Sequence, residues 1–164
     1  MEVALISDTH VPSRSSHVPQ WVRDRVVDAD HVIHAGDFDS KGAFADVRDL
    51  ASELTAVHGN MDPTLGLPTH ASVELGGVEF VVTHGTGSPR GYLDRVARIV
   101  EEEAETDGPV VGVVGHTHDV LDITHAGVRL LNPGSATGAA PADGTTMMVL
   151  DVADGEFDVT LREE

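Results

Sequence analysis

The chain has 164 residues, enough for one domain with an independently stable core, and we expect that single domain to cover residues 1–164. It contains no cysteine, which excludes disulfide bonds and thiolate metal sites. Its 28 acidic and 10 basic residues give a formal net charge of −18, which makes binding to a nucleic-acid backbone unlikely because no basic patch can neutralise phosphates.

The acidic residues are spread along the whole chain rather than gathered in a tail. An acidic surface for a basic partner and an adaptation to concentrated salt are both open, and the even spread favours the second. The longest apolar runs are strand-sized, so we expect no membrane span. The first residues, MEVALISD, have no basic segment and enter a strand pattern directly, which predicts a cytoplasmic protein.

Strands and helices alternate in the first part of the chain. Residues 18–30 have helical spacing, with Trp21, Val22, Val26 and also Val27 on one face. Ser40 is a suitable N-cap for a second helix, which extends to about residue 50. Apolar, β-branched runs that end at polar residues predict three strands, at 2–8, 31–37 and 54–60.

Strands dominate the second part. Residues 71–85 are predicted to form a hairpin around Gly76-Gly77, and residues 91–105 carry the clearest amphipathic helix pattern. A strand at 109–118 is followed by four short strands, VLDIT, VRLLNPG, TTMMVLDV and EFDVTL. This order favours an α/β layered fold, with a mixed sheet or two sheets flanked by helices.

Five of the predicted strands end in residues that can bind a metal ion. Ligand sites in open α/β sheets lie outside the carboxyl ends of strands, so the five ends are expected to meet. The candidate ligands are Asp8, His10, Asp37, Asn60, His84, His116 and His118. Oxygen and imidazole donors suit Mn²⁺, Fe²⁺, Co²⁺, Ni²⁺ or Zn²⁺. Seven ligands are enough for two ions if one carboxylate bridges them.

With these residues in order, the chain resembles the calcineurin-like metallophosphoesterase superfamily, and most closely its group of short, single-domain bacterial and archaeal phosphodiesterases. The motifs D-x-H, G-D, G-N, H-G and G-H-x-H follow one another as they do in that family, from Asp8 to the segment LLNPGS at 130–135. The resemblance implies the metallo-dependent phosphatase fold, in which two mixed sheets pack as a sandwich with helices outside.

The resemblance also implies roles for the seven candidates. One ion would be held by Asp8, His10 and His118, the other by Asn60, His84 and His116, and Asp37 would bridge them. The implied reaction is hydrolysis of a small phosphate ester, most simply a diester, by a metal-bridging hydroxide. Mn²⁺ is the first expectation for the two divalent ions, and Ni²⁺, Fe²⁺ and Zn²⁺ remain open.

The chain departs from the larger phosphatases of the family at Met61, where they carry a histidine placed to protonate the leaving group. Methionine cannot donate a proton, so the general acid is unidentified. Asp62 is a candidate, although an acid in this position more often orients a neighbouring ligand. Arg90 is a candidate for a phosphate contact, against the simpler interpretation of a solvated loop arginine. Because Met61 cannot protonate a leaving group, we predict a preference for esters with good leaving groups.

The remaining histidines and one further acid are interpreted as structural. His34 and His58 are expected to be hydrogen-bonded core residues, and Asp39 a cap or loop acid. The expected surface or loop histidines are His17, His31, His70 and His125. Two alternatives to an enzyme remain, a catalytically idle scaffold on the same fold and a metal-binding module without turnover. The oligomeric state is open.

Overall fold

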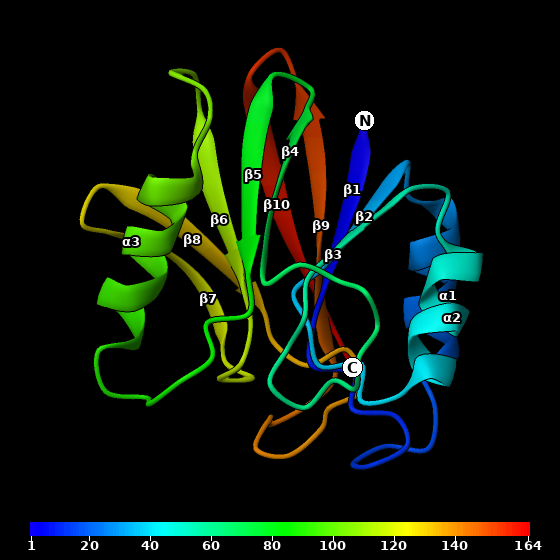
Figure 1. Cartoon of the computed structure of the whole chain (residues 1–164). Helices are drawn as coiled ribbons and strands as arrows, with labels where there is room; N and C mark the ends of the chain where they lie inside the picture. Colours follow the sequence, from blue (N-terminus) through cyan, green and yellow to red (C-terminus); the bar gives the residue numbers. More distant parts are fainter.

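The computed structural model describes residues 1–164 as two five-stranded β-sheets packed face to face, with helices outside (Figure 1). The strands are β1 (Glu2–Ile6), β2 (His31–His34), β3 (Leu54–Ala56), β4 (His70–Leu75), β5 (Val78–Thr83), β6 (Val110–Val114), β7 (Val120–His125), β8 (Val128–Pro133), β9 (Thr146–Ala153) and β10 (Glu156–Glu163). Their orders are β10-β9-β1-β2-β3 and β4-β5-β6-β8-β7. Both sheets contain parallel and antiparallel pairs, so the predicted sandwich of mixed sheets is confirmed.

Helices α1 (Gln20–Asp28) and α2 (Lys41–Leu50) lie against the first sheet, and α3 (Tyr92–Glu103) lies against the second (Figure 1). Ser40 caps α2 as predicted, because its side chain accepts a hydrogen bond from the amide of Ala43 at 3.0 Å. The predicted apolar face of α1 was too wide, since Val22 and Val26 are buried but Val27 is half exposed. None of the three helices has the length and apolarity to cross a membrane.

Both faces of the central strand β1 are buried, which explains its unbroken apolar sequence. Val3 and Leu5 point into the core between the two sheets, where they form one cluster with Phe80 and Val113 of the second sheet. Ala4 and Ile6 point the other way, toward α1 and α2. A third core lies between α3 and the second sheet. The molecule therefore has four layers, and the sandwich is held by apolar contact on every internal face.

The strands end earlier than the sequence pattern predicted. The runs predicted at 2–8 and 31–37 stop at Ile6 and His34, and the run at 109–118 stops at Val114. The motif residues therefore lie in loops beyond the strands, not on them. Parallel pairing of β2 with both β1 and β3, and of β5 with β6, sends all five loops to one end of the molecule (Figure 1).

Candidate metal centre

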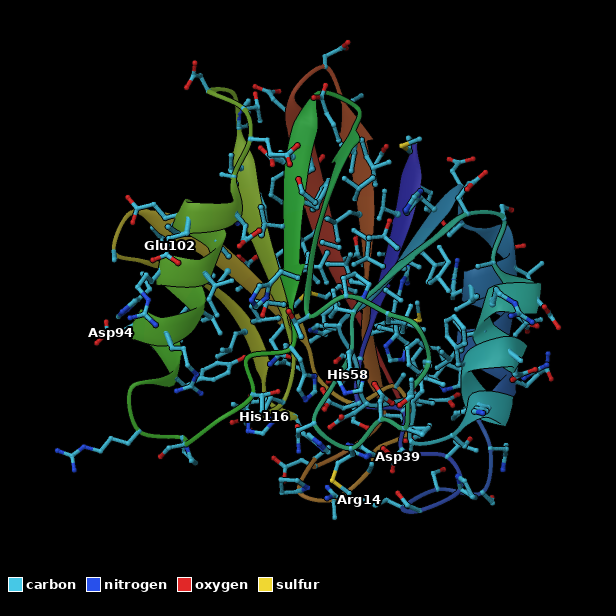
Figure 2. All side chains as sticks on the ribbon, viewed as in Figure 1. Arg14, Asp39, His58, Asp94, Glu102 and His116 are labelled. Carbon is cyan, nitrogen blue, oxygen red and sulfur yellow. The ribbon has the colours of Figure 1, made fainter.

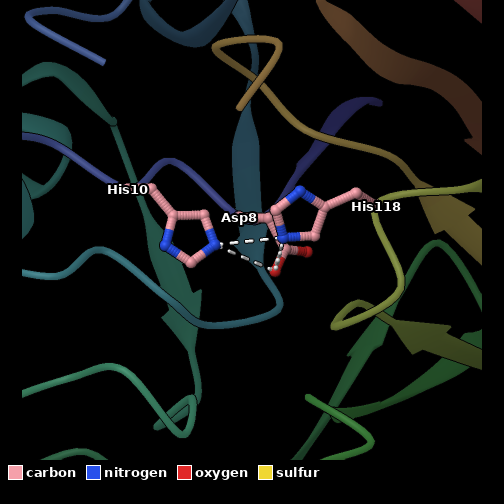
Figure 3. A group of neighbouring side chains, drawn as sticks. All are labelled: Asp8, His10 and His118. Atoms are coloured by element: carbon pink, nitrogen blue, oxygen red, sulfur yellow. Dashed lines mark hydrogen bonds and ion pairs between the residues drawn. The ribbon is translucent and has the colours of Figure 1, made fainter. Parts of the chain in front are cut away.

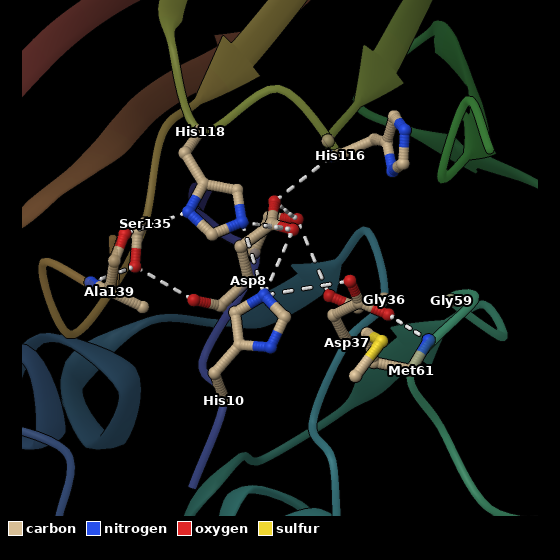
Figure 4. A network of polar contacts seen from close by, with 12 residues as sticks. Asp8, His10, Gly36, Asp37, Gly59, Met61, His116, His118, Ser135 and Ala139 are labelled. Carbon is tan, nitrogen blue, oxygen red and sulfur yellow. Dashed lines mark hydrogen bonds and ion pairs between the residues drawn. The ribbon is translucent and has the colours of Figure 1, made fainter. Parts of the chain in front are cut away.

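All seven predicted ligands meet at this end of the sandwich. They come from the loops after β1, β2, β3, β5 and β6, and an unbroken series of short side-chain contacts connects them. Figure 4 shows the part of this network around Asp8, His10, Asp37 and His118. The spatial convergence that was expected from the strand ends is therefore present in the fold.

Asp8, His10 and His118 form the more buried group (Figure 3). The Nε2 atoms of the two histidines are 3.1 Å apart. The Oδ1 atom of Asp8 lies 3.6 Å from Nε2 of His10 and 3.3 Å from Nε2 of His118. Each of the three side chains is at most 5% exposed, so water has little access to these atoms.

Asp37, Asn60, His84 and His116 form the more open group. Nε2 of His84 lies 3.1 Å from Oδ2 of Asp37 and 3.0 Å from Oδ1 of Asn60. Nδ1 of His116 lies 3.1 Å from the same oxygen of Asn60. Asp37 also approaches Nε2 of His10 at 3.5 Å, so its carboxylate stands between the two groups. Asn60 is exposed and His116 half-buried, which leaves this group accessible from outside.

The surrounding acceptors fix the orientation of three of the imidazole rings. Nδ1 of His10, His84 and His118 each faces an oxygen at 2.7–2.9 Å that can only accept a hydrogen bond. Nδ1 must therefore carry the hydrogen, and in the neutral ring the lone pair of Nε2 points to the centre. The acceptors are the carboxylate of Asp39 and the carbonyls of Ala35 and Ala139.

His116 is oriented in the opposite sense. Its Nε2 faces the carbonyl of Gly87 at 2.8 Å, so Nδ1 carries the lone pair toward Asn60. Lone pairs thus converge from both groups with no donor between them. Oδ1 of Asp8 is buried without any hydrogen-bond partner. Buried acceptors without a donor are costly, and a bound cation removes that cost. The donor set therefore fits borderline divalent metal ions.

The close approach of carboxylates and imidazoles shifts the pKa values of the residues in the centre. Burial alone would raise the pKa of Asp8, but the imidazoles of His10 and His118 hold it well below its usual range. Burial likewise opposes the shift at Asp37, whose pKa is lowered by His84. The pKa values of His10 and His84 are raised by these carboxylates despite their burial. The site therefore favours positive charge between the rings and the carboxylates, as protons or as metal ions.

The backbone of the centre is strained. Asp8, His10, Asp37, His116 and His118 have φ values from +47° to +74°, a region that non-glycine residues seldom occupy. Such conformations cost of order 1–3 kcal/mol each and persist where the surrounding structure enforces them. They turn each ligand inward after its strand. His116 and His118 lie beyond the end of β6, so these turns, and not strand alternation, bring both rings to the same side.

Gly115 shows how closely the loops approach one another. A Cβ atom at this position would lie 2.9 Å from Oδ2 of Asp8 and would collide with the side chain of Ser7. Any side chain would therefore displace the carboxylate from His116, whose amide donates to it at 3.1 Å. Gly115 is required because there is no room for a Cβ atom, and not because its φ value favours glycine.

Two acids outside the predicted ligand set complete the site. Asp39 was expected to be a cap or loop acid, but both of its oxygens lie within 3.0 Å of Nδ1 of His10, so it positions that ring. Asp62 accepts hydrogen bonds from the amides of Asp37, Asp39 and Gly59 at 2.8–3.0 Å. The spacing of Asp37 and Asp39, two residues apart after one strand, was the available signal for Asp39.

The segment NPGS at 132–135 holds the loops after β1 and β6 by hydrogen bonds. Asn132 donates to the carbonyl of Gly115 at 3.2 Å, and the hydroxyl of Ser135 donates to the carbonyl of Asp8 at 2.7 Å. Both side chains are fully buried. The segment thus ties the first and last motifs together, a role that its sequence did not indicate.

The other sequence predictions have mixed outcomes. His34 is a buried core residue as expected, with its ring 3.6 Å from that of Phe38. His31 was wrongly assigned to the surface, since it is buried and contacts Thr55. His58 is not a core residue, because it is half-buried and its ring makes no hydrogen bond. Arg90 is exposed and its guanidinium makes no hydrogen bond or ion pair, so nothing in the structure directs it toward the centre.

Comparison with known proteins agrees with this geometry. Residues 1–155 match the calcineurin-like phosphoesterase superfamily domain. The chain belongs to that superfamily. A protein of Methanothermobacter thermautotrophicus named "Probable metallophosphoesterase" is 35% identical over 158 residues, which cover 95% of this chain and 88% of that protein. The family resemblance inferred from the motifs is therefore confirmed.

Solved structures show the same fold. Vps29 from Entamoeba histolytica, in a structure described as complexed with Zn²⁺, has 28% identity and a TM-score of 0.77, covering 100% of this chain and 98% of that one. A protein described as a novel archaeal phosphodiesterase has 22% identity and a TM-score of 0.73, covering 99% of this chain and 100% of that one. At that identity the second likeness concerns the fold alone.

Proposed function

We propose that this metallophosphoesterase is a phosphodiesterase that uses two divalent metal ions to hydrolyse small phosphate esters. The observation that carries the proposal is the convergence of imidazole lone pairs and carboxylate oxygens, with Oδ1 of Asp8 buried among them without a hydrogen-bond partner. Asp8, His10 and His118 would hold one ion, Asn60, His84 and His116 the other, and Asp37 lies where a bridging ligand is needed.

Two divalent ions held there would activate water, orient the ester and leave a net positive charge beside Asp8 and Asp37 to receive an anionic phosphoryl group. The contribution of the chain is to keep the ligands in place before any ion arrives. Asp39 and three carbonyls hold the four rings, and Asp62 holds the two loops that carry Asp37 and Asn60. Such support of metal ligands governs affinity and activity.

The general acid of the larger family members has no counterpart here. Met61 is 45% exposed, and only its backbone amide contacts the centre, donating to Oδ1 of Asp37 at 2.8 Å. The carboxylate of Asp62 acts as an acceptor in every hydrogen bond it makes, so we assign it to positioning the loops rather than to proton donation. This favours esters whose leaving groups need no protonation. The preference for Mn²⁺ and a cytoplasmic location stay predictions.

A scaffold without catalysis is the alternative that the likeness to Vps29 raises. Loss of ligands would be the sign of such a role in this chain. All seven ligand positions are instead occupied by competent side chains, and the acceptors that orient the rings of His10, His84 and His118 are in place. The intact and oriented donor set supports an enzyme.

The first experiment compares hydrolysis of bis-p-nitrophenyl phosphate with that of p-nitrophenyl phosphate. Metal-stripped protein is assayed at high salt after addition of Mn²⁺, Ni²⁺ or Zn²⁺, and bound metal per chain is measured by elemental analysis. Asp37→Asn is the matched variant, because it preserves shape while removing the shared charge. We expect two ions per chain, metal-dependent turnover that favours the diester, and loss of turnover in the variant. Two bound ions without turnover of either ester would contradict the proposal and favour the scaffold.

A further inference from the structure

A cavity of about 380 Å³ adjoins the open side of the candidate metal centre. Asn60 and His84 belong both to its wall and to the centre. Its remaining wall comes from the loop after β3, the start of β4, the loop after β5, and α3. Ile99 of α3 is the one hydrophobic side chain in this wall. We call this cavity the His58–His70 pocket. Its size lies within the range of about 300–1,000 Å³ that is usual for small-molecule sites.

The His58–His70 pocket contains no carboxylate. Three other cavities of similar or larger size, about 570, 520 and 400 Å³, each contain at least two acidic residues. The cavity beside His118 is walled by Asp119, Asp143, Glu163 and Glu164. In a chain with 28 acidic residues, this pocket thus offers an approach to the centre whose wall does not repel a phosphate ester.

The polar groups of the pocket have free hydrogen-bonding capacity. The ring of His58 makes no hydrogen bond within the protein, and Figure 2 shows it at the same end of the molecule as His116 and Asp39. His70 uses Nδ1 to contact Oγ1 of Thr83 at 3.0 Å, which leaves Nε2 free. Thr86 is exposed. Imidazoles and hydroxyls both donate and accept, so together they match the hydroxyls of an alcohol or sugar.

We propose that the His58–His70 pocket binds an organic group of the substrate ester, and that this group is uncharged and carries hydroxyls, as a ribose or glycerol does. The proposal rests on the proposed function, because an ester phosphate at the centre would place a substituent beside Asn60 and His84. A cationic group such as choline has no counter-charge in this pocket, whereas the cavity beside His118 offers four carboxylates.

Two p-nitrophenyl diesters with the same leaving group test this assignment. Thymidine 5′-(p-nitrophenyl phosphate) carries an uncharged, hydroxylated group, and p-nitrophenylphosphorylcholine carries a cation. Ile99→Trp fills the pocket, and His70→Ala removes a hydrogen-bonding group without touching a ligand. Glu102→Trp is the matched control, since Glu102 is exposed on the same helix and lies outside the pocket (Figure 2).

We expect wild-type protein to have the higher kcat/KM for the thymidine ester. The ratio of the two kcat/KM values should fall about tenfold in Ile99→Trp and about threefold to tenfold in His70→Ala, mainly through KM for the thymidine ester. Glu102→Trp should keep the wild-type ratio. An unchanged ratio in both pocket variants, or a wild-type preference for the choline ester, would overturn the proposal.

Binding without turnover provides the second measurement. The methyl resonances of Ile99 in Zn²⁺-loaded protein should shift on addition of thymidine 5′-monophosphate but not of phosphocholine, while those of Ile123 on β7 should shift with neither. Absence of a selective shift at Ile99 would reject the pocket. A selective shift in protein that hydrolyses neither ester would reject the phosphodiesterase and retain the pocket, so the two failures are distinguishable.

Discussion

Strand β5 has a buried ionisable residue near its first residue and another just beyond its last, and the two have opposite surroundings. The carboxylate of Glu79 accepts hydrogen bonds from the hydroxyl of Ser72 and the amides of Glu105 and Thr106, at 2.6–3.1 Å. His84, beyond the other end, points a lone pair at Asp37 and Asn60, which are acceptors themselves. Glu79 is satisfied by the protein alone, whereas the centre around His84 requires a cation.

The difference separates stability from function along one strand. A buried carboxylate with a complete set of donors rigidifies the fold, and its removal leaves those donors unpaired. A cluster of acceptors with strained backbone does not stabilise the metal-free fold in this way. Its arrangement is maintained by the two sheets and by Asn132 and Ser135. Substitutions at Glu79 and in the metal centre should therefore have opposite consequences.

The largest effect is expected from Asp8→Asn. The variant should lose about 10³-fold or more in activity, because metal-ion stabilisation of a phosphoryl transition state is worth several kcal/mol and each 1.36 kcal/mol is tenfold. The free energy of unfolding of the metal-free protein should change far less than the activity does, because the asparagine oxygen can keep the hydrogen bond from the amide of His116 and Oδ1 of Asp8 has no donor to lose. Kinetics and urea unfolding measure the two quantities. A large loss of metal-free stability would show that Asp8 resembles Glu79.

Met61→His should raise activity toward an alkyl monoester. Met61 is exposed and its backbone contact with Asp37 survives substitution, so the histidine would add a proton donor without disturbing the ligands. General acid catalysis is worth about 10²–10⁴-fold, and we expect a gain of about 10² on the alkyl ester with little change on p-nitrophenyl esters. Met61→Gln is the control. The same rate on the alkyl ester in all three proteins would contradict our account of the leaving-group preference.

Asp39→Asn should weaken metal binding about 10- to 100-fold, because Asp39 orients the ring of His10 without being a predicted ligand. Titration of the metal-stripped protein with Zn²⁺ and a competing chelator measures the affinity. Asp49→Asn, an exposed acid on α2, controls for the loss of one charge. Equal Zn²⁺ affinities of Asp39→Asn and Asp49→Asn would show that Asp39 does not support the metal site.

Glu79→Gln should leave kcat unchanged and reduce the free energy of unfolding by about 1–2 kcal/mol at pH 7. Burial alone would raise the pKa of Glu79, but the hydrogen bonds from Ser72, Glu105 and Thr106 lower it below its ordinary 4.5. The unfolded chain therefore binds the proton first, so the stabilisation is complete above about pH 5 and is lost as the pH falls through the folded-state value. Urea unfolding at pH 7 and pH 4 should show a difference between wild type and variant that shrinks on acidification. A difference independent of pH would exclude the carboxylate as its source.

Local sequence patterns predicted most of the fold. The Gly76-Gly77 hairpin, the Ser40 cap and the apolar stripe of α3 each depend on residues close together in the chain, so they were recognisable. The strand boundaries were less accurate, because the backbone turns at Asp8 and His116 depend on packing between loops from both sheets. The burial of His31 was missed for a similar reason, since its partner Thr55 is on the neighbouring strand.

By itself the sequence determined the seven candidate ligands and the order of the strands that carry them, because ligand chemistry and apolar runs are properties of residue types. Only the tertiary structure decided how those ligands are held. Asp39, Ala35, Ala139 and Gly87 orient the rings, and each lies at least 21 residues from the histidine it contacts. Ring orientation depends on contacts between distant loops, and no pattern along the chain records which loops meet.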